Sequence, residues 1–314
     1  MNRMAVSLDA AVDGDAGRTE TARAKINLAL HVVGRRSDGY HRIETLVVFA
    51  DFGDTISAEP GTGSGVDLVV GGPFADLLAD ASPTSNLAVR AANELIAASG
   101  GKRPSPTRLV LTKRIPVAAG LGGGSADAAA ALRLLNRTWG IGLDPDALAW
   151  IGRRLGADVP MCLLSRPLVA TGIGEELTAV DGMPAMPIVL AHSGGALSTA
   201  SVFARVAKAD RPPLPARPPK WTALADVVAW LKETRNDLEA PAAEVLERAG
   251  AAAQALRADP ECLFARMTGS GAAAFGIYAT RHAASRAAAR LRQENPGWWV
   301  TEATTGAADD GGGS

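Results

Sequence analysis

A run of glycines within residues 116–136, PVAAGLGGGSADAAAALRLLN, limits most strongly what this chain can fold into. It contains four glycines in close succession: Gly120, Gly122, Gly123 and Gly124. Without a Cβ, their backbone N–H groups can turn toward one point. An alanine- and leucine-rich helical segment follows at 128–135, and Ser125 stands where an N-cap belongs. Unpaired amides and the positive end of the helix dipole meet at such a junction, so the sequence predicts a phosphate-binding loop.

Two better-known phosphate-binding patterns are absent from this stretch. No lysine follows the glycines in a GxxxxGK[ST] arrangement, and there is no GxGxxG with an acidic residue downstream to bind a ribose. A tight connection without a ligand is the simpler interpretation of a short glycine triplet. Because this run is longer and opens directly into a helix, it favours an anion site of a different kind.

Two charged residues far apart in the sequence are candidates for chemistry. Polar and apolar residues alternate over 24–33 as in a half-buried strand, so Lys25 and Asn27 share a face. Lys25 alone could be a solvated strand charge. Asp158 lies in the segment ADVP, where an unpaired charge would be unfavourable. Such an acid is a helix cap, a salt-bridge partner or a reactive group held by a cation.

Turn and cap signals predict further elements. Strands are predicted over 45–52 and 54–58, with Gly53 as the break between them. A helix is predicted to begin after Ser85, as its N-cap, and another over 145–155, where a proline suits the first turn.

Composition excludes several classes of protein. The 314 residues carry a formal net charge of -1, so neither nucleic acid nor an acidic membrane is an expected partner. No apolar run is long enough to span a membrane and no secretory signal is recognisable, so a cytoplasmic protein is expected. The two cysteines, Cys162 and Cys262, are expected to be reduced, and the four histidines suggest no metal site.

Three stretches resemble the signatures of the GHMP kinases. The phosphate loop at 116–126 resembles the second signature, and MTGSGAAAFGIY at 267–278 resembles the third, whose small residues pack on that loop. The first signature is matched by ARAKINLALHVVGRRSDGYHRIETL at 22–46. Three glycines before Ser125 and GADVP at 156–160 are similar to one branch of the family, the 4-diphosphocytidyl-2-C-methyl-D-erythritol kinases.

The resemblance covers about residues 22–305 and implies an α+β fold of two domains. The N-terminal GHMP kinase domain, resembling ribosomal protein S5 domain 2 and binding ATP, is expected over 22–180. A ferredoxin-like C-terminal domain is expected over 181–305, with the site between the two. The small, polar residues 1–21 and 306–314 are predicted to be a disordered leader and tail.

The resemblance also implies an activity: ATP-dependent phosphorylation of the 2-hydroxyl of 4-diphosphocytidyl-2-C-methyl-D-erythritol, with Mg²⁺, in the non-mevalonate route to isoprenoid precursors. Lys25 and Asp158 would be the catalytic pair. The implied ATP site consists of Asn86, Lys113, Pro116, Ala118, Ala119, Gly120, Leu121, Gly122, Gly123, Gly124, Ser125 and Ala126. The implied substrate site consists of Asn27, Tyr40, His41, Asp158, Thr199 and Phe203.

The residue types of the implied cytidine site suit its chemistry. Tyr40 offers a flat face for a pyrimidine, and the ring nitrogens of His41 can donate and accept at a cytosine edge. Lys113 could equally be a surface charge, and Phe203 an ordinary core residue. Other GHMP kinases place an acidic metal ligand after the loop, but Asp127 matches that position poorly, so no protein ligand for a metal is predicted.

Two other functions are compatible with parts of the sequence. Homoserine and mevalonate kinases share the superfamily but lack the pyrimidine-binding segment at 38–41. A regulator that has lost catalysis is disfavoured because Lys25 and Asp158 are both present. The expected partner is a small molecule carrying cytidine diphosphate, with no nucleic acid or membrane, and the protein is expected to be a monomer or weak homodimer. The Pro- and Arg-rich segment 209–220 is predicted to be a surface loop.

Overall fold

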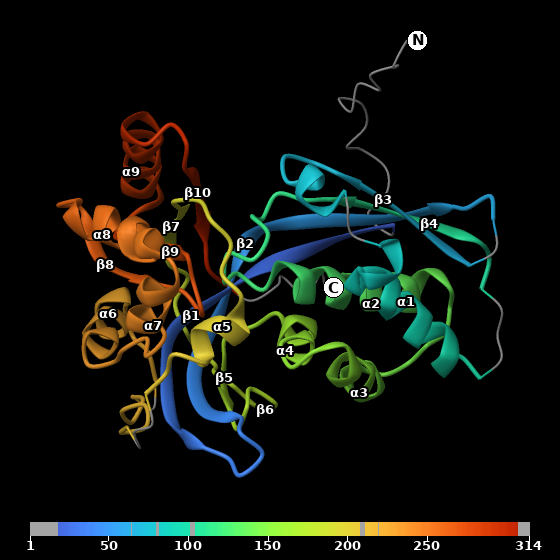
Figure 1. Ribbon diagram of the computed structural model, residues 1–314, viewed down its shortest axis with the longest axis horizontal. Helices are drawn as coiled ribbons and strands as arrows, with labels where there is room; N and C mark the ends of the chain where they lie inside the picture. Colours follow the sequence, from blue (N-terminus) through green and yellow to red (C-terminus); the bar gives the residue numbers. More distant parts are fainter. Residues whose placement is uncertain are drawn as a thin grey trace.

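The computed structural model describes residues 18–306 except 64, 80–81, 101–103, 208–210 and 219. These residues form one sheet of six strands and one of four, with helices packed against both (Figure 1). None of the helices in the described part is long and apolar enough to cross a membrane. Most of the predicted leader and all but the first residue of the predicted tail lie outside the described residues.

Two long antiparallel strands, β1 (Thr19–Arg35) and β2 (His41–Pro60), are the centre of the first sheet. The first half of β2 pairs with β5, and its second half with β4. The sheet has the order β3–β4–β2–β5–β6, with β1 also paired to β2. The four shorter strands are β3 (Val66–Gly71), β4 (Thr107–Thr112), β5 (Leu168–Thr171) and β6 (Glu176–Ala179).

Four helices cover one side of this sheet in Figure 1: α1 (Leu87–Ala98), α2 (Gly123–Thr138), α3 (Pro145–Leu155) and α4 (Val159–Leu164). Helix α2 packs against α1, α4, β1 and β2. Its buried face is mostly alanine, which allows the helix to lie close to the strands. Two 3₁₀ turns, Ala75–Leu78 and Pro83–Ser85, lie between β3 and α1.

The second sheet has the order β10–β7–β9–β8, with every neighbouring pair antiparallel. Its strands are β7 (Pro187–His192), β8 (Cys262–Met267), β9 (Ala273–Tyr278) and β10 (Trp299–Thr304). Helices α8 (Ala251–Ala258) and α9 (Arg281–Glu294) pack on one face. This β-α-β-β-α-β arrangement is ferredoxin-like, as predicted.

Between β7 and α8 the chain forms α5 (Thr199–Phe203), α6 (Leu224–Lys232), α7 (Glu239–Val245) and the 3₁₀ turn Glu247–Gly250. The described residues of the Pro- and Arg-rich segment, 211–218 and 220, contain no helix or strand, as expected for a loop. The predicted domain boundary at 180/181 falls between the last strand of the first sheet and the first strand of the second. We propose it as the division between two domains.

Strand β1 is buried on both faces, where the sequence predicted a half-buried strand. Ile26 and Leu28 pack with Phe275 and Ile277 of the second sheet in one apolar core. The opposite face lies under α2 and the glycine loop. The alternation in the sequence was correct, but the second covering layer comes from residues about 250 positions later, which no local pattern reveals.

Strand β1 also begins earlier than predicted. Thr19 already pairs with Ser57 of β2, so residues 19–21 belong to the fold and not to the leader. The reason is Glu20, whose carboxylate accepts hydrogen bonds from Arg133 Nε at 3.1 Å and Arg137 Nη1 at 2.8 Å on α2.

Three local predictions were wrong for backbone reasons. Asn86, and not Ser85, caps α1 by accepting a hydrogen bond from Ala88 N–H at 2.9 Å. Ser125 is the third residue of α2, because Gly122 takes a left-handed conformation and lets the helix begin at Gly123. Gly53 does not break β2: a Cβ there would lie 2.1 Å from a carbonyl oxygen of β1, so glycine permits a close strand crossing.

Candidate active site

A cleft of about 860 Å³ lies between the glycine loop, β1 and the segments that follow β7. It collects nearly all the predicted site residues: Lys25, Asn27, Asn86, Lys113, Pro116, Ala118, Ala119, Gly120, Leu121, Gly122, Gly123, Gly124, Ser125, Asp158, Thr199 and Phe203. Three predicted residues do not line it: Tyr40, His41 and Ala126. Residues from both halves of the chain therefore meet at one cavity, as expected for a site between two domains.

The glycine loop, residues 116–126, bends through three residues in the left-handed region: Ala118 with φ of 56°, Gly120 with φ of 79° and Gly122 with φ of 67°. The first hydrogen bond of α2 runs from Ala126 N–H to the Gly122 carbonyl at 2.9 Å. The amides of residues 123–125 precede that bond, and these residues line the cleft. Amides at a helix N-terminus bind anions, so phosphate groups fit here.

The two predicted catalytic residues form an ion pair. Lys25 Nζ lies 2.8 Å from Asp158 Oδ2, with the lysine buried and the acid 39% exposed toward the cleft. Asp158 precedes α4 but its side chain does not cap that helix, so of the three alternatives the helix cap is excluded and the carboxylate is held by a cation, Lys25. Lys25 N–H donates to the Leu121 carbonyl at 2.9 Å, and a Cβ on Gly122 would lie 3.0 Å from Lys25 Cε. The pair therefore lies directly against the glycine loop.

Lys113 is not a surface charge. It is buried and donates from Nζ to Asp54 and, at 2.7 Å, to Asp127 Oδ2. Asp54 Oδ1 also accepts from the N–H groups of Arg114 at 2.5 Å and Ile115 at 2.8 Å. The Asp54–Lys113–Asp127 cluster thus ties β2, the entrance of the glycine loop and α2 together. Asp54 was missed at the sequence level, although an acid at a core-facing position of β2 was a visible signal.

Asp127 accepts fewer hydrogen bonds than Asp54 in the Asp54–Lys113–Asp127 cluster. Burial raises its pKa to about 7, against the opposing effect of Lys113 and with a further rise from Asp54. Its Oδ1 has no hydrogen-bond partner among the described residues. These residues contain no group of three or more His, Cys, Asp or Glu side chains arranged to hold a metal ion.

Asp127→Asn is expected to stabilise the fold in a pH-dependent way. Between about pH 4 and pH 7 the folded protein holds a proton at Asp127 that the unfolded chain, with a pKa near 3.8, has released. The free energy of unfolding therefore falls as pH rises through this window. Denaturant unfolding should show the variant gaining stability relative to the wild type up to pH 7, by on the order of 4 kcal/mol, and gaining no more above it.

The matched control for that experiment is Asp54→Asn. Asp54 accepts from Lys113 and from two backbone amides, so an amide in its place removes acceptors and should lower stability at every pH tested. An Asp127→Asn variant with the wild-type pH profile would contradict the assignment of a raised pKa to Asp127.

Of the three aromatic residues predicted to bind cytidine, two lie against each other and the third, Tyr40, lies apart. The rings of His41 and Phe203 stack with centroids 5.4 Å apart and planes at 29°. Burial, helped by Arg35, lowers the pKa of His41, which favours the neutral ring that can both donate and accept. Tyr40 is 63% exposed in the turn between β1 and β2, outside the cleft lining.

Asn27 and the turn between β8 and β9 form the opposite wall. Asn27 Nδ2 donates to Thr45 Oγ1 at 2.8 Å, while its buried Oδ1 has no hydrogen-bond partner among the described residues. Ser270 Oγ lies 3.0 Å from Thr199 Oγ1. A Cβ on Gly120 would lie 2.7 Å from Gly271 N, so the third glycine-rich motif packs on the phosphate loop as the resemblance implied.

Known proteins share both the sequence and the fold. The family model for the GHMP kinases N terminal domain matches residues 86–166, and that for the GHMP kinases C terminal domain matches residues 221–297. The chain is 44% identical to the 4-diphosphocytidyl-2-C-methyl-D-erythritol kinase of Chelativorans sp. (strain BNC1), over 91% of this chain and 96% of that protein. It is 47% identical to the enzyme of that name from Rhizobium etli (strain ATCC 51251 / DSM 11541 / JCM 21823 / NBRC 15573 / CFN 42), over 92% of this chain and 96% of that protein.

A crystal structure of 4-(cytidine 5'-diphospho)-2C-methyl-D-erythritol kinase superimposes with a TM-score of 0.73 at 33% identity, covering 92% of this chain and all of that one. Agreement in both sheets, over nearly the whole length and at this identity, is more than a shared architecture. The chain belongs to the 4-diphosphocytidyl-2-C-methyl-D-erythritol kinase family of the GHMP kinases.

Proposed function

We propose that this protein transfers the γ-phosphoryl group of ATP to the 2-hydroxyl of 4-diphosphocytidyl-2-C-methyl-D-erythritol, in the non-mevalonate route to isoprenoid precursors. The observation that carries the proposal is the ion pair of Lys25 and Asp158, 2.8 Å apart and against the glycine loop. It occurs in a chain that is 44% identical to a kinase of that name over nearly its whole length.

Phosphoryl transfer needs positioning and charge neutralisation more than covalent chemistry from the protein. The amides of residues 123–125 and the N-terminal dipole of α2 would bind the triphosphate. Mg²⁺, held mainly by phosphate oxygens, would neutralise negative charge there. The amide cradle suits a magnesium nucleotide because neutral N–H groups bind phosphate oxygens without cancelling the negative charge that a cation would balance.

The oxygen of the substrate hydroxyl would attack the γ-phosphorus of ATP while Asp158 accepts the proton of that hydroxyl. ADP would be the leaving group. Lys25 balances the charge of that carboxylate and fixes its direction, because its Nζ donates at 2.8 Å and its backbone N–H is held by the loop. The cytosine would stack on Phe203, with His41 behind that ring and Tyr40 moving in from the rim. The cytoplasmic location and the monomer or weak homodimer stay predictions.

Phe203→Ala is expected to raise KM for the cytidylated substrate about 10- to 100-fold, because stacking of a base on an aromatic ring contributes about 1–3 kcal/mol. KM for ATP should change little, since Phe203 is on the side of the cleft away from the glycine loop's helix. Initial rates with each substrate varied in turn measure both constants.

Phe52→Ala is the control for that prediction. The Phe52 ring contacts Trp299 at 5.8 Å, and Phe52 is not among the residues that line the cleft. Its removal should lower stability without raising KM for the substrate. Equal KM values for wild type and Phe203→Ala would rule out Phe203 as the stacking face.

A coupled ADP-release assay tests the function itself. The protein is given ATP with 4-diphosphocytidyl-2-C-methyl-D-erythritol, homoserine or mevalonate as the acceptor. Turnover with the first alone, and competition by CMP against it, is the expected result. Faster turnover of homoserine or mevalonate would replace this proposal with the corresponding kinase, and binding of ATP without turnover of any acceptor would favour a regulator.

A further inference from the structure

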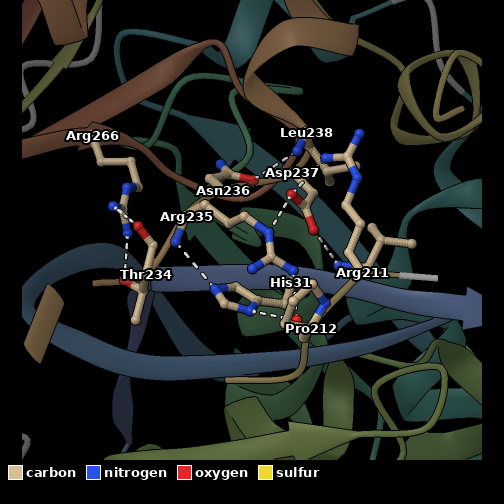
Figure 2. A network of polar contacts seen from close by, with 10 residues as sticks. His31, Arg211, Pro212, Thr234, Arg235, Asn236, Asp237, Leu238 and Arg266 are labelled. Carbon is tan, nitrogen blue, oxygen red and sulfur yellow. Dashed lines mark hydrogen bonds and ion pairs between the residues drawn. The ribbon is translucent and has the colours of Figure 1, made fainter. Parts of the chain in front are cut away.

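A short segment between α6 and α7, residues 234–238, lies along the free edge of β1. Leu30 N–H donates to the Arg235 carbonyl at 3.0 Å, and Asp237 N–H donates back to the Leu30 carbonyl at 2.9 Å. Leu30 and Asn236 thereby form one isolated bridge of parallel sheet. Figure 2 shows residues 234–238 running alongside the strand that carries His31. These hydrogen bonds therefore attach the segment to β1, the strand that contains Lys25.

Asp237 fastens the segment to β1 with its side chain. Its carboxylate, 1% exposed, accepts from Val32 N–H, Arg211 Nη1 and Arg235 Nε at 2.7, 2.7 and 2.8 Å (Figure 2). Burial acts to raise the pKa of Asp237, but these hydrogen bonds and ion pairs outweigh it and hold the pKa below the ordinary value. The carboxylate is therefore a fixed anchor for the segment that carries its neighbour, Asn236.

Asn236 faces away from β1 and closes the turn between β8 and β9. Its Nδ2 donates to the carbonyls of Met267 and Gly269, both at 2.9 Å. Its Oδ1 accepts from Leu238 N–H at 3.0 Å. Since Asn236 is buried, water cannot easily replace these bonds, and both amide hydrogens are committed to the same turn.

The turn that Asn236 holds, residues 268–271, contacts both halves of the proposed site. Thr268 Oγ1 accepts from Asn27 N–H at 2.8 Å, on the side of the acceptor alcohol. A Cβ on Gly120 would lie 2.7 Å from Gly271 N and 2.8 Å from the Thr268 carbonyl, on the side of the phosphates. With contacts this close, a shift of the turn must displace either the glycine loop or β1.

We propose that Asn236 is a positioning residue for phosphoryl transfer: it holds the 268–271 turn so that the glycine loop and the catalytic strand keep one relative placement. Asn236 itself does not line the cleft and has no contact with the reacting groups. The inference rests on the proposed kinase function, because the two substrates held by the loop and the strand must meet in line. A misplacement of about 1 Å can lower such a rate by about 10²-fold.

Asn236→Ala tests this inference, with Asn136→Ala as the matched control. Asn136 has the same two-sided pattern, donating to and accepting from the backbone of Leu143, but it lies at the far end of α2 and outside the cleft lining. Both variants should lose stability. Only Asn236→Ala should lose kcat, by about 10- to 100-fold, with a smaller rise in KM for ATP. Wild-type kcat for Asn236→Ala, or an equal loss in Asn136→Ala, would overturn the proposal.

Thr268→Val extends the test if Asn236→Ala does not fold. Valine keeps the shape of Thr268 and removes the acceptor for Asn27 N–H, so kcat should fall about fivefold or more, by the loss of one buried hydrogen bond. Where both single variants fold, the losses in the double variant should be less than additive, because both act through the same turn. Strictly additive losses in the double variant, or an unchanged kcat in Thr268→Val, would contradict the inference that both residues act through the 268–271 turn.

One measurement separates this inference from the kinase assignment. Amide hydrogen exchange at Gly271, whose N–H donates to the Thr268 carbonyl at 3.0 Å, reports the rigidity of the turn without any substrate. In Asn236→Ala the Gly271 amide should exchange at least tenfold faster than in the wild type. In Asn136→Ala its exchange rate should stay at the wild-type value. If the wild type phosphorylates none of the acceptors, the proposed function fails; if Gly271 exchange is unchanged in Asn236→Ala, the inference fails whatever the activity.

Discussion

Asp158→Asn is expected to lower kcat by about 10²- to 10⁴-fold, the range for removing a positioned general base. Asparagine has nearly the same shape and can still accept from Lys25 Nζ, which lies 2.8 Å from the carboxylate in the wild type. The fold and the glycine loop should therefore persist, and the dissociation constant of ATP should stay nearly unchanged. Steady-state kinetics with calorimetric titration of ATP measures both quantities.

Asp181→Asn is the control for this experiment. Asp181 also forms an ion pair, with Arg166 at 2.5 Å, but its side chain is 82% exposed and it lies outside the cleft lining. Such a pair contributes little, so kcat and stability should stay close to wild type. If Asp158→Asn turned over as fast as Asp181→Asn, proton acceptance by Asp158 would be wrong, and the ion pair with Lys25 would be structural only.

The sequence predicted the pieces of the site better than their surroundings. Alternation over β1 correctly put Lys25 and Asn27 on one face, because both line the cleft. Composition and spacing could not pair Lys25 with Asp158, since their contact depends on α2 and α4 packing against β1; only the family resemblance implied it. The 2.8 Å contact in the structure agrees with that implication.

What escaped prediction was mostly the interaction partners of the residues that the sequence singled out. Lys113 was selected as a site residue, yet its two carboxylate partners come from β2 and α2, and no local pattern brings those two elements into register. Tyr40 was expected beside the cytosine but is exposed at the tip of a two-strand turn, where residues 36–40 make only local backbone contacts.

Asn236 is the clearest case of a pattern without a visible reason. Residues 236–238, Asn-Asp-Leu, resemble a segment of the family, but a buried amide that binds the carbonyls of Met267 and Gly269, some 30 residues later, has no local signature. The helix start at Pro145 was predicted from local signals, and there Asp144 accepts from Ala147 N–H at 2.8 Å, although the cap residues predicted for α1 and α2 were wrong. Predictability from this sequence therefore fell with the distance along the chain between interacting groups.

The second large effect is expected from Gly120→Ala, which should disable the phosphate loop. Gly120 has φ of 79°, and a Cβ there would lie 2.7 Å from Gly271 N and 2.8 Å from two carbonyl oxygens, all of them backbone atoms that cannot rotate away. Left-handed strain of about 1–2 kcal/mol adds to an overpacking cost of about 1–3 kcal/mol. The free energy of unfolding should fall by about 2–5 kcal/mol, and the affinity for ATP should fall at least about 10²-fold as the loop and the turn separate.

Gly142→Ala isolates the steric part of that effect. Gly142 has nearly the same backbone angle, φ of 77°, but a Cβ there meets nothing within 4 Å. It should therefore show only the left-handed strain of about 1–2 kcal/mol and normal ATP affinity. Denaturant unfolding and calorimetric ATP titration of the two variants compare one backbone conformation with and without the close approach. Equal ATP affinities would mean that contact between Gly120 and the 268–271 turn does not shape the phosphate site, and the role proposed for Asn236 would lose its path to the nucleotide.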